Sequence, residues 1–217
     1  MDWLQGAADW NWSLISLVLV AVTLLSGYLV FEKSPSCAKD IALIGTLAAL
    51  SGLGRVPFAA VPGLQPTTFV VLCSGYVLGP LAGFIIGSSA AFASNFFLGH
   101  GPWTPWQMLA WGMVGISSGM LKRMGLRHAY PFLLILSFLW GFVFGWLMNM
   151  WHWLTFVHPL TPKTLIAVNL TSIWFDSVHA VGNLVFMFLF GRGFVSILKR
   201  FNLRLSFEYV PPAIKRK

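Results

Sequence analysis

Four polar side chains interrupt the last apolar run of the sequence, and they are the residues best suited to chemistry. Asn169, Asp176, His179 and Asn183 lie at offsets of 0, 7, 10 and 14, so a helix places them on one stripe. An Asp in mid-membrane costs about 2.5–3.5 kcal/mol on insertion scales, which makes such a residue a functional-site hypothesis. Asp176 and His179 lie three residues apart and can pair. The stripe predicts a polar clamp between helices, a substrate contact or a gating element.

A second pattern would support nucleophilic catalysis. Residues 115–119 read GISSG, and His179 lies on a later apolar run. An intramembrane serine protease needs a Ser–His pair within hydrogen-bond reach, which makes Ser117 and His179 the candidates. Ser117, however, lies toward the basic end of its segment, and Ser and Gly are ordinary packing residues in membrane helices. Protease activity is therefore kept as an alternative hypothesis.

The segments that would position these residues are long and apolar. Hydrophobic residues make up 57% of the 217 residues and charged residues only 9%, whereas soluble domains are usually about 45–50% apolar. About 20 apolar residues cross a bilayer as a helix. The two cysteines lie in different contexts, so neither a disulfide nor a metal site is expected. The sequence predicts an all-α integral membrane protein with seven spans, at residues 12–31, 38–54, 66–79, 81–98, 105–121, 131–152 and 164–191.

The charges between these spans predict an orientation. Only Arg55 and Lys163 fall on one side of the membrane, and the other 12 of the 14 basic residues fall on the opposite side. Because cytoplasmic loops carry an excess of Lys and Arg, we expect the N-terminus, with Asp2 and Asp9, outside and the C-terminus in the cytoplasm. The same rule accounts for the net charge of +8 without nucleic-acid binding. The 12 residues are Lys33, Lys39, Lys122, Arg123, Arg127, Arg192, Lys199, Arg200, Arg204, Lys215, Arg216 and Lys217.

Three stiff, aromatic loops lie on the side of Arg55. They comprise residues 54–66, 99–106 and 151–163, and each contains Pro, which fixes φ and removes a backbone donor. Trp is expected at any membrane interface, but rigid apolar loops also suit a lid over a pocket, and both interpretations stay open. Asn95 and Gln107, near the helix ends on this side, would supply further hydrogen bonds.

Four groups of motifs, which together span most of residues 38–191, carry a resemblance to a known family. They are RVPF at 55–58 with LQPTT at 64–68, SGYVLGPLAGF at 74–84, SNFFLGHGPWTPWQMLAWG at 94–112 and FDSVHAVGN at 175–183. On these motifs the sequence resembles the S components, the substrate-binding subunits, of energy-coupling factor (ECF) vitamin transporters. The run GPWTPWQM is the most specific part of the resemblance.

The resemblance implies a six-helix membrane bundle with cytoplasmic termini and an outward pocket capped by loops. This chain then has one extra span. The resulting division is an extra N-terminal helix with its outside tail (residues 1–34), a six-helix substrate-binding core (35–195) and a basic cytoplasmic tail (196–217). Family members dock on a shared transmembrane partner through an Ala-x3-Ala face on the first core helix, and Ala38 and Ala42 match that spacing.

The resemblance also implies a multi-pass binding subunit of a prokaryotic plasma membrane, not an enzyme, with no cofactor of its own. The expected partners are a vitamin-type ligand, the ECF transmembrane subunit and two ATPase subunits. The sequence has no G-x4-GK[ST] run to bind ATP phosphates, so the ATP-driven step belongs to other chains. The motifs are most like the cobalamin and corrinoid branch. Trp-rich loops suit a large, partly apolar ligand, and Arg55 suits one phosphate or carboxylate on it.

The residues predicted to bind substrate come from the stripe, the loops and the resemblance. A structural membrane subunit, in which the stripe only clamps helices together, is kept as a further alternative. The predicted set is Arg55, Gln65, Asn95, Trp103, Thr104, Trp106, Gln107, Trp151, Asn169, Asp176, His179 and Asn183.

Overall fold

The structure is a computed structural model that describes residues 11–125 and 129–205. Those residues form seven α-helices and one short 3-10 turn, with no strand among them, which confirms the predicted all-α class. Each predicted span coincides with one helix. The elements are α1 (Trp12–Glu32), α2 (Ala38–Leu53), η3 (Val56–Phe58), α3 (Thr67–Leu78), α4 (Pro80–Leu98), α5 (Thr104–Arg123), α6 (Ala129–Phe156) and α7 (Pro162–Leu205).

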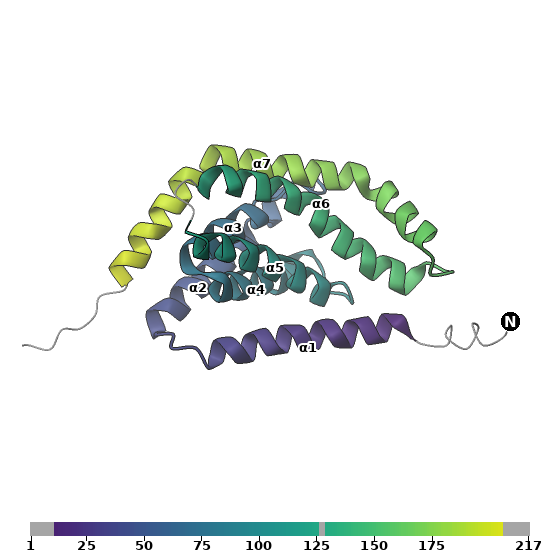
Figure 1. Ribbon diagram of the computed structural model, residues 1–217, viewed down its shortest axis with the longest axis horizontal. Coiled ribbons are helices and arrows are strands. Elements are labelled where there is room, and N and C mark those ends of the chain that lie inside the picture. Colours follow the sequence, from purple (N-terminus) through teal and green to yellow (C-terminus); the bar gives the residue numbers. More distant parts are fainter. Residues whose placement is uncertain (1–10, 126–128, 206–217) are drawn as a thin grey trace, which may run out of the picture.

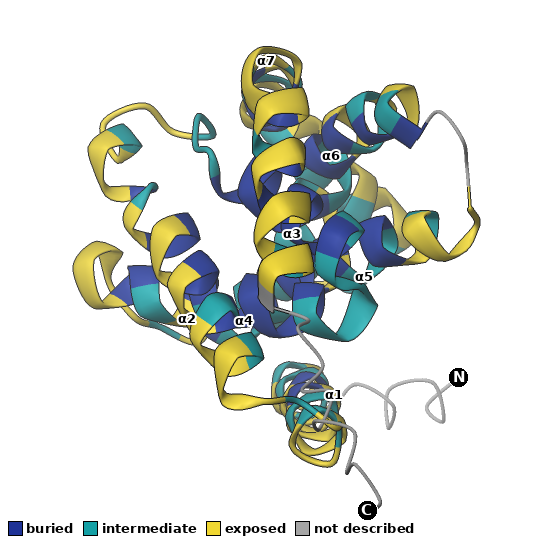
Figure 2. Cartoon of the chain, turned by 90° about the vertical axis from the view of Figure 1, so that its left-hand side faces the viewer, coloured by how far each residue is buried: buried dark blue, intermediate teal, exposed yellow. Residues whose placement is uncertain are grey.

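The helices form a bundle with a packed centre and two outer layers. Figure 1 shows α6 and α7 side by side along the top, α1 along the bottom, and α2 to α5 between them. The central helix is α3, which contacts α2, α4, α5, α6 and α7. In Figure 2, buried residues gather on the facing sides of these inner helices, whereas α1 lies at the edge with most of its surface exposed.

Proline and glycine set several helix boundaries. α3 ends at Gly79, whose φ of +104° is accessible to glycine but rarely to other residues. Pro80 then opens α4 in its first turn, where the missing N–H has no intrahelical partner to lose. Gly99, with φ of +99°, ends α4, and Pro105 lies in the first turn of α5. The chain therefore reverses direction sharply between α3 and α4.

Within residues 11–125 and 129–205, five helices are long and apolar enough to cross a membrane: those that begin at Trp12, Ala38, Pro80, Ala129 and Pro162. α3 is apolar but has only 12 residues, as the short apolar run at 66–79 indicated. Because neighbouring helices enclose α3, it does not have to match the bilayer by itself. α5 has 20 residues but is not among the five.

Glycines let α3, α4 and α5 approach one another with their backbones in contact. A Cβ atom added to Gly83 would overlap the backbone of Gly115, and one added to Gly115 would overlap the backbone of Gly83. A Cβ atom on Gly87 would overlap the carbonyl of Trp111, and one on Gly75 would overlap the carbonyl of Gly115. We call these four glycines the glycine seam. Small residues at such spacings are the usual means of close helix approach in membranes.

α1 contacts the bundle through the Phe84 ring, through hydrogen bonds of Tyr28 to α4, and through a 3.2 Å contact between the Ser13 and Thr155 hydroxyls. Gly27 and Gly112 lie against opposite sides of the Phe84 ring, where an added Cβ would overlap ring carbons. The Tyr28 hydroxyl lies 3.0 Å from the hydroxyls of both Ser88 and Ser89 of α4. The predicted extra helix is thus a peripheral element that packs on α4, α5 and α6.

The two ends of the bundle differ in charge. Near the end of α3, Lys122 Nζ donates to Val77 O at 2.6 Å, and Lys199 Nζ lies 5.4 Å from the Tyr76 ring centroid. We call this the basic end, and the opposite end the Arg55 end. α7 continues without a break past residue 195, so the proposed division at 35–195 and 196–217 stays a prediction. The charged residues Asp2, Asp9, Arg127, Lys215, Arg216 and Lys217 lie outside the described residues.

The glycine seam predicts a strong effect of a single added methyl group. Gly87→Ala should lower the free energy of unfolding by about 1–3 kcal/mol, because overpacking a tight helix contact forces the backbones apart. Gly45→Ala is the matched control, since a Cβ there meets no atom within 4 Å. Thermal unfolding in detergent measures both variants, and equal midpoints would contradict the role of the seam.

Candidate functional site

Arg55 is the centre of a polar network at its end of the bundle. It follows α2 directly, and its side chain turns inward, so that the residue is only 8% exposed. Its Nε–H donates to Gln65 Oε1 at 2.8 Å, and Nη1 donates to Ser94 Oγ at 2.5 Å and Asn95 Oδ1 at 3.3 Å. The guanidinium therefore ties the loop before α3 to the last turns of α4.

Asn95 extends this network to α5. Its Nδ2 donates to Thr104 Oγ1 at 3.0 Å and to Gln107 Oε1 at 2.8 Å. Thr104 Oγ1 also accepts from the backbone N–H of Gly101 at 3.2 Å, which anchors the loop between α4 and α5. The amide orientation of Asn95 is self-consistent, because its oxygen faces the cation and its nitrogen faces two acceptors.

A second branch runs from Arg55 through an aromatic ring to α7. The guanidinium carbon lies 4.5 Å from the centroid of the Trp111 ring, a cation–π contact. Trp111 Nε1 donates to Thr68 Oγ1 at 3.2 Å, and that hydroxyl lies 3.2 Å from His179 Nε2. Because indole N–H is only a donor, the Thr68 hydroxyl accepts from Trp111 and is free to donate to His179. The Thr68 hydroxyl thus links the Trp111 ring to His179.

The loop that carries Arg55 and Gln65 also packs against α7. Gly63, with φ of +83°, passes close to the backbone of Phe175 and His179, and Leu64 lies over Gly182. Close approach at Gly63 needs glycine, because a Cβ would lie 3.0 Å from Phe175 O. The loop at residues 54–66 therefore covers the part of α7 that includes the predicted stripe.

Asp176, His179 and Asn183 of the stripe on α7 are buried and Asn169 is half-buried, but the stripe divides into two groups. Asp176 Oδ2 accepts from Ser172 Oγ at 2.9 Å, and Asn149 Nδ2 of α6 donates to Ser172 Oγ at 2.7 Å and Asn169 Oδ1 at 3.1 Å. The predicted pairing of Asp176 with His179 is not formed, since Ser172 and Thr68 bind these two side chains instead. Asn169 and Asp176 thus belong to a contact between α6 and α7.

Two predicted residues have buried polar atoms without a partner among the described residues. Asn183 is fully buried, and both its Oδ1 and Nδ2 lack a hydrogen bond. Trp106 Nε1 is also buried and unpaired. The other two predicted tryptophans, Trp103 of the α4–α5 loop and Trp151 of α6, form an edge-on pair with ring centroids 5.9 Å apart. Unpaired buried polar groups are rare in native structures. The side chains of Asn183 and Trp106 therefore have unused hydrogen-bonding capacity that a bound molecule could satisfy.

The geometry does not support nucleophilic catalysis by Ser117. Its hydroxyl donates to Val114 O at 2.7 Å and accepts from Trp140 Nε1 at 2.9 Å, while His179 contacts Thr68. In the described part of the chain no hydrogen bond joins Ser117 to His179. The Ser–His pair that the protease hypothesis requires is therefore missing.

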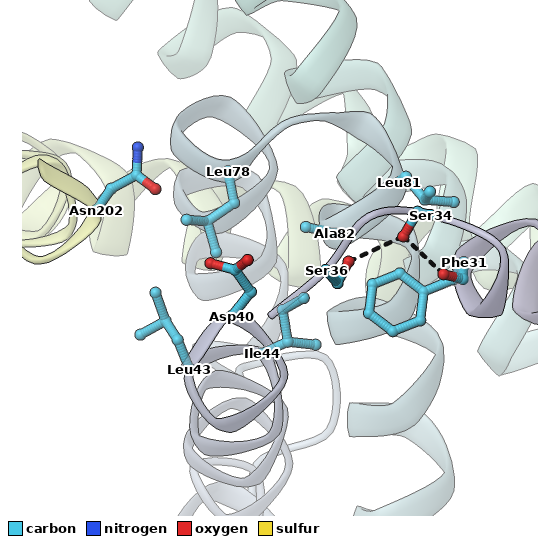
Figure 3. A pocket seen from close by; sticks show the side chains of 10 residues that line it. All are labelled: Phe31, Ser34, Ser36, Asp40, Leu43, Ile44, Leu78, Leu81, Ala82 and Asn202. Carbon is cyan, nitrogen blue, oxygen red and sulfur yellow. Dashed lines mark hydrogen bonds between the residues drawn. The ribbon is translucent and has the colours of Figure 1, made fainter. Parts of the chain in front are cut away.

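A pocket of about 260 Å³ lies at the basic end, between the α1–α2 connection, α3, α4 and the end of α7. Figure 3 shows Asp40 of α2 between Leu78 and Leu43, with Asn202 of α7 across from it. The nearby Ser34 hydroxyl bonds to Phe31 O and the Ser36 hydroxyl. None of the predicted substrate-binding residues lines this pocket.

Sequence reasoning missed several members of the Arg55 network. Ser94, Thr68 and Trp111 lie inside the motifs that carry the family resemblance, but each looks like an ordinary residue of an apolar helix. Asn149 was missed although it is the one amide within the sixth apolar run. Its polarity was a usable signal, because a polar side chain in mid-span needs a partner.

The polar network at Arg55 lies within the part of the chain that matches a known protein family. The family model described as ECF transporter, substrate-specific component, matches residues 39–201. The chain therefore belongs to this family. The match begins in α2, so α1 precedes it.

Curated relatives are similar over part of the chain. A UPF0397 protein of Vibrio atlanticus is 33% identical over 92 residues, which are 40% of this chain and 50% of the relative. A UPF0397 protein of Aliivibrio fischeri strain MJ11 is 31% identical over 123 residues, 50% of this chain and 66% of the relative. The chain thus spans about half to two thirds of the length of these relatives. No solved structure matches it.

Because Thr68 links Trp111 to His179, removal of its hydroxyl group should lower the stability of the protein. Thr68→Val should lower the free energy of unfolding by about 1–3 kcal/mol, because it leaves the buried N–H of Trp111 without an acceptor. Thr46→Val is the control, since the Thr46 hydroxyl is exposed and bonds only within its own helix. Thermal unfolding measures both, and a control as unstable as the Thr68 variant would argue against the branch.

Proposed function

We propose that the protein captures a vitamin-type small molecule at the Arg55 end and delivers it to an ATPase-driven ECF module. The observation that carries this proposal is the convergence of Arg55, Gln65, Asn95, Gln107 and His179 on one network. These residues come from four separate segments, the loop at 54–66, α4, α5 and α7, and all of them were predicted as ligand contacts. Polar groups placed by rigid elements among aromatic side chains are typical of small-molecule sites.

The unpaired polar atoms extend the proposed site. Asn183 Oδ1, Asn183 Nδ2 and Trp106 Nε1 are buried without partners, and a ligand with matching donors and acceptors would satisfy them. Asn169 and Asp176 are assigned to clamping α6 against α7, because their hydrogen bonds are local to that pair of helices. Trp103 and Trp151 form part of the aromatic surroundings.

The ligand that we favour is cobalamin or a corrinoid precursor. The support is the resemblance of the motifs and the aromatic character of the loops at the Arg55 end, which suit a large and partly apolar molecule. The charge distribution favours an orientation with the Arg55 end outside and the basic end in the cytoplasm. In that orientation the two ATPase subunits lie next to the basic end.

A screen of purified protein against vitamins tests this proposal. Cobalamin or cobinamide should raise the midpoint of thermal unfolding, because a ligand that binds only the folded state stabilises it. Asn183→Leu should weaken that binding and leave the ligand-free protein as stable as the wild type or more stable by about 1–3 kcal/mol, because it removes an unpaired buried amide.

The same variant separates ligand contact from clamping. If Asn183 only clamps helices, Asn183→Leu will destabilise the ligand-free protein and leave ligand affinity unchanged. No stabilisation by any corrinoid would reject the favoured ligand, and no stabilisation by any vitamin would reject the substrate class.

The docking face on α2 is a further part of the proposal. Ala38 and Ala42 are exposed and share one face of α2 with Gly45 and Ala49, which are exposed as well. A face of small residues lets a partner helix approach closely. We assign this face to the ECF transmembrane subunit.

A bulky residue on this face should block assembly. Ala42→Leu should reduce co-purification with the ECF transmembrane subunit at least tenfold without changing ligand affinity. Val22→Leu, at an exposed position of α1, is the control and should leave co-purification unchanged. Equal recovery of the partner with both variants would place the docking face elsewhere.

A further inference from the structure

Arg55 is a buried cation without a counter-ion. The described part of the chain contains three carboxylates, and none forms an ion pair with Arg55. Glu32 and Asp40 lie near the α1–α2 connection at the basic end, and Asp176 is held by Ser172. Every group that contacts the guanidinium is neutral: the oxygens of Gln65, Ser94 and Asn95, and the ring of Trp111.

Such an arrangement is unusual for a purely structural residue. Charged side chains are almost never buried unless they are paired, and burial of an unpaired charge is strongly unfavourable. The hydrogen bonds and the cation–π contact compensate for part of the lost hydration, but they supply no negative charge. A structural clamp would be served as well by a neutral amide, whereas a binding site for an anion requires the cation.

The geometry leaves one edge of the guanidinium available. A guanidinium has five N–H donors, and Nε and Nη1 direct theirs to Gln65, Ser94 and Asn95. Nη2 has no hydrogen bond to a described residue, yet it is not among the enclosed unpaired atoms, so it borders accessible space. Trp111 covers a face of the group. The remaining approach is along the Nη2 edge.

We propose that the transported molecule carries a carboxylate or phosphate group and that the Nη2 edge of Arg55 binds it. Gln65, Ser94 and Asn95 are positioning residues, which hold the guanidinium in place before the ligand arrives and so reduce the loss of entropy on binding. Oxyanions and guanidinium groups form charge-assisted hydrogen bonds, which are stronger than those between neutral groups. This inference rests on the proposed function and adds the chemical class of the substrate to it.

Simple anions test the site without knowledge of the ligand. Inorganic phosphate or acetate should raise the unfolding midpoint of the purified protein more than chloride does at equal ionic strength. Arg55→Gln should raise the phosphate concentration needed for half of this shift at least tenfold. Lys163→Gln is the matched control, because Lys163 is the other basic residue predicted on this side and is exposed. It should leave the response unchanged.

A second variant covers the case in which Arg55→Gln does not fold. Gln65→Glu keeps the shape of the side chain and places a carboxylate beside Nε of Arg55. It should raise the unfolding midpoint of the ligand-free protein and abolish the response to phosphate, because the cation then has an internal counter-ion. A wild-type protein that responds no more to phosphate and acetate than to chloride would overturn the inference.

Matched ligand pairs identify the source of the anion. The pairs are cobinamide phosphate with cobinamide, pantothenate with panthenol, and biotin with biotinamide, compared by calorimetry. We expect one anionic member to bind at least tenfold more tightly than its neutral counterpart, and Arg55→Gln to remove that preference. Equal binding of both members overturns the inference and leaves the proposed function intact. If the response to phosphate depends on Arg55 but no vitamin binds, the anion site is supported and the proposed vitamin ligand is rejected.

Discussion

The architecture depends on the backbone contact between α4 and α5 at the glycine seam. At Gly83, Gly87 and Gly115 no side chain separates the two helices, so that backbone atoms touch. This approach fixes the end of α4 beside the start of α5. Asn95 can therefore reach both Thr104 and Gln107. A wider spacing, which any Cβ at the seam would impose, would separate the donors and acceptors around Arg55.

The network at Arg55 and the clamp between α6 and α7 are different uses of buried polar groups. Asn149, Ser172 and Asp176 are joined by hydrogen bonds across a single helix pair, and these bonds hold the two helices together. The Arg55 network instead joins five segments and still leaves the Nη2 edge of its cation without a partner. A set of polar groups that is complete by itself stabilises a structure, whereas an incomplete set of rigidly held groups is suited to a ligand.

Much of this could be predicted from the sequence, and the failures have physical causes. Apolar run lengths predicted the seven helices, and the spacing of the four polar residues of α7 placed them on one stripe, of which Asp176, His179 and Asn183 are buried. The pairing of Asp176 with His179 was wrong because local spacing ignores competing partners from other elements, here Thr68 of α3. Trp111 was missed for the same reason. Its role depends on a guanidinium that arrives from a loop 56 positions earlier in the chain.

Helix α1 ends before residue 39, where the match to the family begins, so it is an addition to the part that matches the family. An added helix disturbs a shared partner only if it covers the surface where that partner binds. α1 packs on α4, α5 and α6, and it leaves the small-residue face of α2 at Ala38 and Ala42 exposed. Its contacts with the bundle join Gly27 to the Phe84 ring, Tyr28 to Ser88 and Ser89 of α4, and Ser13 to Thr155 of α6. An added helix in this position therefore leaves the proposed docking face uncovered.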